Sequence, residues 1–172
     1  MTCRRCLHPA QLGVPCTAGP MMAGYVGLVA DTASWASSAG TRASMRANRS
    51  RDTGPELAVR RAVHALGLRY RVSVRPVPSL RRTADLVFTR ARVVVFVDGC
   101  FWHGCPEHHT VAVTNADFWA AKVTLNRDRD IQTSRLLREA GWTVLRFWEH
   151  EDPAEAALVI HQAWSRRQGF AL

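Results

Sequence analysis

Lysine is almost absent from this sequence of 172 residues, in which Lys122 is the only one. Lysine and arginine together number 23 against 14 acidic residues, which gives a formal net charge of +9. Arginine therefore carries nearly all of the positive charge, and its planar guanidinium binds two phosphate oxygens at once. The charge favours a polyanionic partner, although a bias in codon composition explains an arginine excess about equally well.

The sequence also lacks a paired-cysteine pattern and a long apolar run. Its five cysteines are an odd number and fall into two separate groups, which is not typical of a disulfide framework. No apolar run approaches the roughly 20 residues that a membrane helix needs. These absences predict a cytoplasmic protein with no membrane partner, and the length suffices for one domain with a real core.

Two parts of the chain differ in composition. Residues 1–44 are rich in Gly, Ala, Ser and Thr and show no helical or strand period. We interpret them as a disordered N-terminal extension, or as residues upstream of the true start, since Met45 is a plausible internal start. The predicted folded domain is 45–172.

Periodicity and turn signals in the second part predict the order helix, strand, strand, strand, helix, strand, helix. The expected elements are a helix over 53–66, strands over 70–74, 84–89 and 93–97, helical runs starting near 114 and 126, a strand over 142–148, and a helix over 152–164. The run 93–97 has no polar interruption, which is typical of a central strand covered on both faces. With 84–89 it should form a hairpin, within an α/β sandwich around a mixed sheet.

A polar loop rich in cysteine and histidine follows that central strand. Cys100 and Cys105 are separated by four residues, and His108 and His109 come just after them. Sulfur and imidazole ligands at this spacing predict a zinc site, with His150 after the last strand as the fourth ligand. The spacing favours His108 over His109. The alternative is a pair of buried cysteines near surface histidines, and the clustering of the ligands makes it the weaker interpretation.

Three acids are candidates for chemistry on phosphate. The hairpin brings Asp85 close to Val97 and Asp98, and carboxylates with a backbone carbonyl can hold Mg²⁺, which activates an attacking water. Glu56 lies in the first turn of the opening helix, where a capping box with Thr53 already explains it. Asp98 precedes a glycine and is explained about equally well as a turn residue.

The same loop contains a proton-transfer group and two large rings. His103, with an ordinary pKa near ~6.5, can take a proton from water or give one to a leaving oxygen. Phe101 and Trp102 would be exposed unless they meet a partner, and such rings stack on bases or wedge between base pairs. Trp119 could act in the same way, although its spacing slightly favours a place in the core.

These motifs resemble the very-short-patch repair endonucleases. The resemblance covers roughly residues 44–152 and rests on Met45-Arg46, Ser50-Arg51-Asp52-Thr53, Glu56, Val97-Asp98-Gly99-Cys100-Phe101-Trp102-His103-Gly104-Cys105-Pro106, Asn115, Phe118-Trp119, Lys122, Asn126, Arg127-Asp128, Gly141-Trp142 and Trp148-Glu149. It implies a restriction-endonuclease-like three-layer sandwich with a structural zinc. It also implies Mg²⁺-dependent nicking 5′ to the thymine of T:G mismatches, which arise when 5-methylcytosine deaminates. The implied functional partner is a cytosine-5 DNA methyltransferase, and we expect a monomer.

The resemblance also implies roles for single residues. These are Asp85 and the Val97 carbonyl for Mg²⁺, His103 as general base, Glu56 orienting a water or the histidine, Phe101, Trp102 and Trp119 as intercalating rings, and Cys100, Cys105, a histidine after Cys105 and His150 for zinc. Ala84 stands where a proline commonly precedes the metal aspartate. Asp98 stands where some members have histidine, so its role as metal ligand, water-positioning residue or neither is open. The alternatives are a same-fold restriction or homing nuclease that cuts matched duplex and a non-catalytic zinc-stabilised DNA-binding module.

Overall fold

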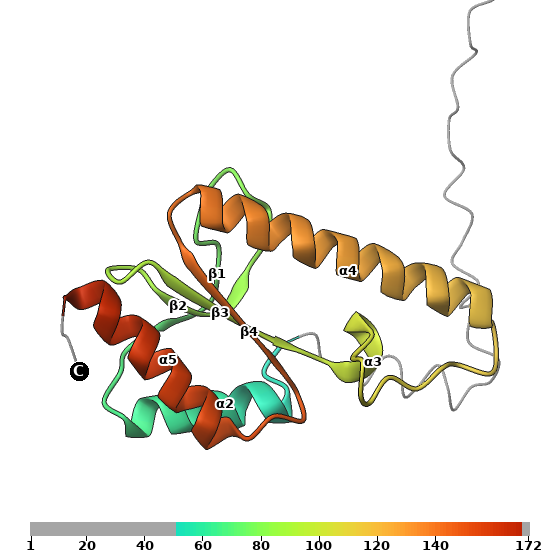
Figure 1. The fold of residues 1–172 in the computed structure, drawn as a ribbon, viewed down its shortest axis with the longest axis horizontal. Helices are drawn as coiled ribbons and strands as arrows, with labels where there is room; N and C mark the ends of the chain where they lie inside the picture. Colours follow the sequence, from blue (N-terminus) through green and yellow to red (C-terminus); the bar gives the residue numbers. More distant parts are fainter. Residues whose placement is uncertain (1–50, 170–172) are drawn as a thin grey trace, which may run out of the picture. The chain divides into compact units, whose positions relative to one another are not determined.

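The computed structural model describes residues 51–169. Its elements are α2 (Gly54–Ala65), β1 (Arg71–Val74), β2 (Ala84–Phe88), β3 (Val93–Asp98), α3 (Cys100–His103), α4 (Ala116–Glu139), β4 (Thr143–Trp148) and α5 (Pro153–Gln168) (Figure 1). The predicted extension over residues 1–44 and its boundary with the domain lie outside the described residues. None of the helices within 51–169 combines the length and hydrophobicity that crossing a membrane requires.

The four strands form one mixed sheet in the order β1-β2-β3-β4. β1 and β3 both pair antiparallel with β2, which confirms the predicted hairpin, and β4 pairs parallel with β3. In the parallel pair Asp98 lies opposite Trp148, so both residues stand at the same edge of the sheet. The chain crosses from β3 to β4 through α3 and α4, and this crossover encloses the candidate site.

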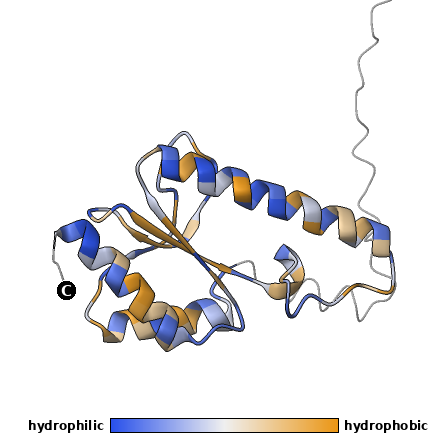
Figure 2. Ribbon diagram, in the orientation of Figure 1, coloured by the Kyte–Doolittle hydropathy of each residue, from blue (hydrophilic) through white to orange (hydrophobic). Residues whose placement is uncertain are grey.

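Helices cover both faces of the sheet, as the predicted three-layer sandwich requires (Figure 1). On one face α2 and α5 contribute Val59, Val63 and Ile160 to a core that includes alternate residues of β2 and β3. On the other face Leu137 of α4 packs against a smaller cluster. The hydrophobic residues accordingly gather in the sheet and in the facing sides of α2 and α5 (Figure 2). Covering on both faces explains why β3 is almost entirely apolar.

The predicted helix starts are confirmed at α2 and α5. The Thr53 hydroxyl accepts the Glu56 N–H at 3.5 Å, and the Asp152 carboxylate accepts two N–H groups in the first turn of α5. The helix predicted over 53–66 ends at Ala65, because Leu66 is its C-cap and is 39% exposed. Leu68, which follows the turn, fills the core instead.

The region predicted as two helical runs is one continuous helix, α4, of 24 residues. At ~1.5 Å per residue it is ~36 Å long and far exceeds the six-residue strand β4. Its C-terminal half packs on the sheet through Leu137, and its N-terminal half extends past the sheet to α3 (Figure 1). Most of α4 is hydrophilic (Figure 2), so no unbroken apolar period revealed a single helix.

Candidate active site

The segment predicted as a loop after β3 contains the short helix α3, which turns the chain back towards the sheet edge. Gly99 is its N-cap, and Gly104 ends it with φ at 64°. A Cβ at Gly104 would lie 2.7 Å from Cγ1 of Val123, so the absence of a side chain lets α3 pack against α4. Asn126 of α4 donates a hydrogen bond of 2.8 Å to the Trp102 carbonyl. Together these contacts fix His103 at the edge where β3 and β4 end.

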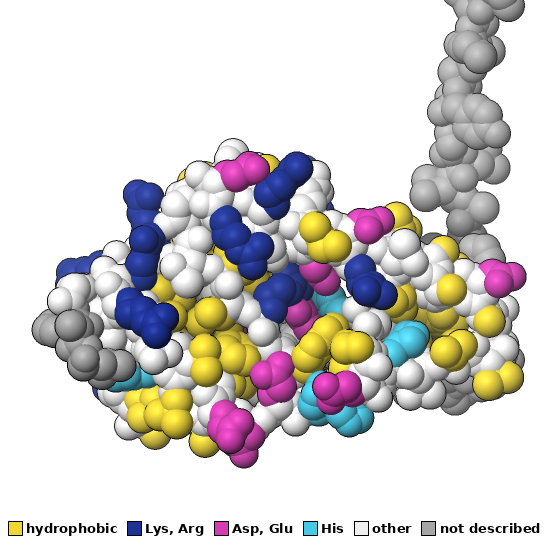
Figure 3. Space-filling model, viewed as in Figure 1, with side chains coloured by type: hydrophobic (Ala, Val, Ile, Leu, Met, Phe, Trp, Pro, Cys, Tyr) yellow, Lys and Arg dark blue, Asp and Glu magenta, His cyan; other side chains and the backbone are white. Residues whose placement is uncertain are grey.

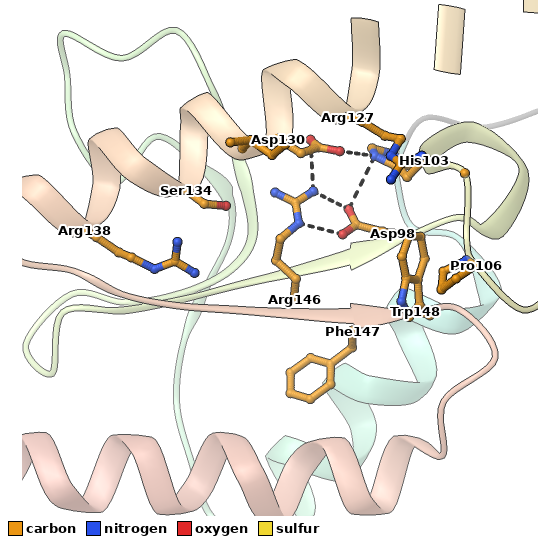
Figure 4. A pocket seen from close by; sticks show the side chains of 12 residues that line it. Asp98, His103, Pro106, Arg127, Asp130, Ser134, Arg138, Arg146, Phe147 and Trp148 are labelled. Carbon is orange, nitrogen blue, oxygen red and sulfur yellow. Dashed lines mark hydrogen bonds and ion pairs between the residues drawn. The ribbon is translucent and has the colours of Figure 1, made fainter. Parts of the chain in front are cut away.

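His103 belongs to a network of four charged side chains, which come one each from β3, α3, α4 and β4 (Figure 4). Its Nδ1 lies 2.5 Å from Oδ2 of Asp130 and 3.7 Å from Oδ1 of Asp98. Arg146 donates to both oxygens of Asp98 at 2.7 and 2.6 Å and pairs with Asp130 at 2.9 Å. The network therefore holds the imidazole against one carboxylate, and a guanidinium links that carboxylate to a second one.

The electrostatics of this network favour a charged His103. Burial lowers the pKa of His103, but the hydrogen bond to Asp130 and the negative charges of Asp98 and Asp130 outweigh it and raise the pKa above its ordinary value. Burial raises the pKa of Asp130, but the hydrogen bond to His103 and the charge of Arg146 lower it by a larger amount. The pKa of Asp130 therefore lies below its ordinary value. Burial also lowers the pKa of Arg146, and the two carboxylates more than compensate. The pairing with Asp130 thus stabilises the protonated form of the His103 imidazole.

Sequence reasoning missed Asp130 and Arg146, although one signal for Arg146 was present. It is a charged residue in the otherwise apolar run 144–148 of β4, and it lies on the α4 face of the sheet. A charge at such a position needs a partner of opposite sign. Asp130 is one of several charged residues on a polar helix, and nothing local distinguishes it.

Asp85 lies beside Val97, as the predicted hairpin requires. The Val97 N–H donates to Oδ2 of Asp85 at 2.8 Å. Burial raises the pKa of Asp85 to about 6, and the nearby charges of Glu56 and Asp98 raise it, whereas the Val97 hydrogen bond and Arg60 lower it. Asp98 therefore connects the His103 network with the acids around Asp85, since it contacts His103 and its charge acts on Asp85. A half-buried carboxylate surrounded by negative charge suits a hard cation, which relieves that repulsion.

Glu56 is buried and its carboxylate is fully engaged by the helix start. It accepts the Asp52 N–H at 3.0 Å and the Thr53 hydroxyl at 3.1 Å, and it forms an ion pair of 2.8 Å with Arg60. Arg60 also pairs with the Asp52 carboxylate. These contacts confirm the capping interpretation, with the backbone bond made to Asp52 instead of Thr53. Glu56 acts on Asp85 through its charge, and its predicted role in orienting a water or His103 stays a prediction.

The three predicted intercalating rings form one cluster. Phe101 lies 5.2 Å from Trp102 and 5.4 Å from Trp119 between ring centroids, and the two tryptophans are 5.6 Å apart. All three pairs are edge-to-face, which is a favourable geometry. Trp102 remains 36% exposed, and Phe118, which packs on Trp119, is 42% exposed. The cluster thus presents aromatic surface to solvent, and Trp102 in it directly precedes His103 in α3.

The predicted zinc ligands also come together. The ligand atoms of Cys100, Cys105, His108 and His150 all lie within 4.8 Å of one another. His150 Nδ1 is 3.1 Å from the Cys100 sulfur and 3.8 Å from the Cys105 sulfur. His109 instead stacks on Phe101, with ring centroids 6.0 Å apart. The structure therefore places His108, as the spacing favoured, with the two buried thiols, and this donor set of two sulfurs and two imidazoles fits Zn²⁺.

An open cleft of about 440 Å³ lies between α4 and the ends of β3 and β4. Asp98, His103, Asp130 and Arg146 line one part of it. On the surface, acidic, basic and histidine side chains meet in a recess below α4, and further basic side chains spread over the same face (Figure 3). A polyanion lying across this face would meet the His103 network directly.

Known proteins with similar sequences identify the family. The sequence model of DNA mismatch endonuclease Vsr matches residues 36–112. The type II nicking enzyme V.NaeI of Lentzea aerocolonigenes is 42% identical over 135 residues, which are 77% of this chain and 81% of that protein. The DNA mismatch endonuclease Vsr of Escherichia coli (strain K12) is 36% identical over 110 residues, with coverages of 62% and 67%. This chain belongs to the Vsr endonuclease family.

The Vsr match contains only part of the site. Asp85, His103 and both thiols lie within residues 36–112, whereas Asp130 and Arg146 follow that range.

A second relative, the type II nicking enzyme V.NmeDIP of Neisseria meningitidis serogroup C, is 39% identical over 132 residues, 74% of this chain and 87% of that protein. Among solved structures, the catalytic domain of the homing endonuclease I-Bth0305I is similar with a TM-score of 0.46 and 16% identity, over 67% of this chain and 98% of that one. That score is too low to assign a shared fold.

Proposed function

We propose that this Vsr-family protein is a strand-specific DNA endonuclease that nicks 5′ to the thymine of T:G mismatches. The observation that carries the proposal is the arrangement of α3, which places the His103–Asp130 pair and the exposed ring of Trp102 within one turn. A proton-transfer group thereby lies beside a surface that can stack on an unpaired base. Relatives named as a DNA mismatch endonuclease and as nicking enzymes support the same reaction.

In this proposal the restriction-endonuclease-like sheet presents Asp85 and the Val97 carbonyl to a Mg²⁺ ion. The raised pKa of Asp85 and the facing charges of Glu56 and Asp98 fit such an ion. When bound, Mg²⁺ would neutralise charge on the phosphate and favour ionisation of an attacking water. Asp98 gives both of its oxygens to Arg146, so we assign it to positioning the network, not to direct metal binding.

The proton is handled by His103. Its Nδ1 is held by Asp130, which leaves Nε2 as the nitrogen that accepts a proton from water as the phosphodiester is attacked. Asp130 then stabilises the imidazolium that forms. Meanwhile Phe101, Trp102 and Trp119 would stack against the bases that flank the mismatch. The free energy needed to unpair and unstack bases is lowest at a mispair, which favours insertion of the rings there.

The four-ligand group of Cys100, Cys105, His108 and His150 would hold a structural Zn²⁺. Burial raises the pKa of Cys100 to about 11, with contributions from Cys105 and from the Glu149 carboxylate. A bound dication would keep both thiolates ionised and tie α3 to the end of β4. Because T:G mismatches arise from deaminated 5-methylcytosine, we place the enzyme in the same repair context as a cytosine-5 DNA methyltransferase.

A strand-labelled nicking assay tests the function. Duplexes with T:G, T:A or C:G at one position are incubated with Mg²⁺ or with chelator and resolved on a denaturing gel. We expect one cut 5′ to the mismatched thymine, only with Mg²⁺. Equal cutting of matched duplex would instead indicate a restriction or homing nuclease, and binding without cutting would indicate a DNA-binding module.

Asp85→Asn tests the metal role in the same assay. Loss of a carboxylate ligand to a catalytic cation should reduce the nicking rate about 100-fold or more, while DNA affinity stays close to that of the unmodified protein. Asp128→Asn is the matched control, since Asp128 is exposed on α4 and contacts none of these groups in the described residues. Normal nicking by Asp85→Asn would remove Asp85 from the reaction.

A further inference from the structure

The cleft that contains His103 has a second end that the reaction described above does not use. This end is lined by Ser134 and Arg138 of α4 and by the outer side of the Arg146 guanidinium. The Ser134 hydroxyl and the Arg138 side chain extend into the space between α4 and β4, towards Arg146 (Figure 4). Both residues lie on the same face of α4 as Asp130, one and two turns further along the helix.

Two polar atoms at this end have no partner among the described residues. One is the hydroxyl of Ser134, a residue that is only 5% exposed, and the other is Nη1 of Arg146. Arg146 uses Nε and Nη2 for Asp98 and Asp130, so Nη1 remains as a free donor directed away from the carboxylates. Buried polar groups without a partner are rare in folded proteins, and a ligand in the cleft would satisfy both of these atoms.

The charge of this end selects an anion. Arg138 carries a full positive charge, and Arg146 is neutralised only on its other side by the two carboxylates. A hydroxyl and two guanidinium groups around one space match the oxygens of a phosphate group, because guanidinium donors bind such oxygens in pairs. A carboxylate ligand would satisfy fewer of these donors.

We propose that Ser134, Arg138 and Nη1 of Arg146 form a binding site for a phosphate group, supplied by the DNA strand that is cut. This rests on the proposed function. Ser134 lies four residues after Asp130, or ~6 Å along α4, which is of the order of one nucleotide step from the phosphodiester at His103. The site therefore fixes the register of the strand in the cleft, because a phosphate held here positions its neighbour at the imidazole.

The salt dependence of DNA binding tests the proposal. Binding of a T:G duplex is measured in chelator at several salt concentrations for the unmodified protein, Arg138→Ala and Arg135→Ala. Each phosphate contact contributes about 0.9 to the slope of log K against log salt, so Arg138→Ala should lower the slope by about that amount. Arg135→Ala is the control, because it removes the same charge from the same helix at an exposed position paired with Glu139. Equal slopes for the two variants would overturn the site.

Ser134→Ala separates binding from folding. Removal of the unpartnered hydroxyl should leave the melting temperature of the free protein unchanged or raised, and should weaken DNA binding about 3- to 10-fold. A lowered melting temperature with unchanged affinity would show that Ser134 serves only the fold, against the proposal. Titration with inorganic phosphate alone distinguishes the source of the group. Binding of free phosphate that Ser134→Ala abolishes, together with unchanged DNA binding in that variant, would overturn DNA as the source.

Neither measurement depends on cleavage. If the protein binds duplex with the predicted slopes but nicks no substrate, the proposed function fails and the phosphate site stands. If it nicks T:G duplex and Arg138→Ala behaves like Arg135→Ala, only the phosphate site fails.

Discussion

Replacing Asp130 by asparagine removes the charge that holds His103 while preserving the shape of the side chain. The His103–Asp130 pair is partly buried, with side chains 27% and 22% exposed and a separation of 2.5 Å. A hydrogen bond to a charged group contributes about 1.5–3 kcal/mol net. If that free energy serves to orient the imidazole, its loss should slow nicking about 10- to 150-fold, since 1.36 kcal/mol corresponds to a factor of ten in rate.

The pH dependence gives a second readout of the same change. A general base works only when it is neutral, so the nicking rate should rise with pH through the pKa of His103. In the unmodified protein that midpoint should lie above the ordinary histidine value of ~6.5, because the carboxylates raise the pKa. Asp130→Asn should move the midpoint to lower pH. Rates are therefore compared on the plateau above both midpoints, where the charge state no longer differs.

The assay is single-turnover nicking of a T:G duplex across pH, with Asp128→Asn as the control. Asp128 is an exposed aspartate two residues earlier on α4, so the same substitution there tests for general effects of charge and helix stability. A plateau rate and midpoint for Asp130→Asn equal to those of Asp128→Asn would refute the role of the pair. His103→Ala should cost more, about 100- to 10,000-fold, because it removes the base itself.

Two further predictions concern the metal and the rings. His108→Ala should lose bound zinc, measured by elemental analysis of the purified protein, and should melt at a lower temperature. His109→Ala should keep its zinc, because His109 stacks on Phe101. Equal zinc content in the two variants would contradict the ligand assignment. Trp102→Ala should weaken binding to T:G duplex about 5- to 150-fold, because stacking contributes about 1–3 kcal/mol per base. The control is Leu125→Ala, at an exposed position on α4. If Trp102→Ala weakens binding no more than this control does, Trp102 does not stack on the DNA.

The parts of the fold that sequence reasoning found are those with local signals. The unbroken apolar run of β3, the alternation in β1 and the capping residues Thr53 and Asp152 each depend on neighbours within a few positions. The continuity of α4 had no such signal, because half of this helix is supported by α3 and not by the sheet. Its buried residues Val123 and Asn126 face a helix of only four residues, which leaves no extended apolar stripe in the sequence.

The same distinction explains what was found of the site. The thiols and His108 are close in the sequence, so their spacing alone indicated a metal site. Asp130 lies 27 residues from His103, and Arg146 lies 48 residues from Asp98, so both contacts exist only once the crossover has folded. Polar residues of this kind become recognisable when the topology assigns them to one edge of the sheet.

The buried ion pair between Asp98 and Arg146 should contribute to stability only while both charges are present. Arg146 of β4 donates to both carboxylate oxygens of Asp98 at the end of β3, so each side chain neutralises the charge of the other. Arg146→Met alone would leave the buried Asp98 carboxylate without its bidentate partner, at a cost of about 3–5 kcal/mol in the free energy of unfolding. Combining it with Asp98→Asn should recover much of that loss, because no uncompensated charge then remains buried.

Urea denaturation of the single and double variants measures this coupling directly. The exposed pair of Arg135 and Glu139, with side chains 67% and 61% exposed, is the reference, and Arg135→Met should cost no more than about 1 kcal/mol. Additive losses in the Asp98 and Arg146 variants would mean that the guanidinium contributes through packing and not through charge. Recovery in the double variant would instead show that Arg146 is retained to neutralise Asp98, and that Asp98 and Arg146 can be exchanged only as a unit.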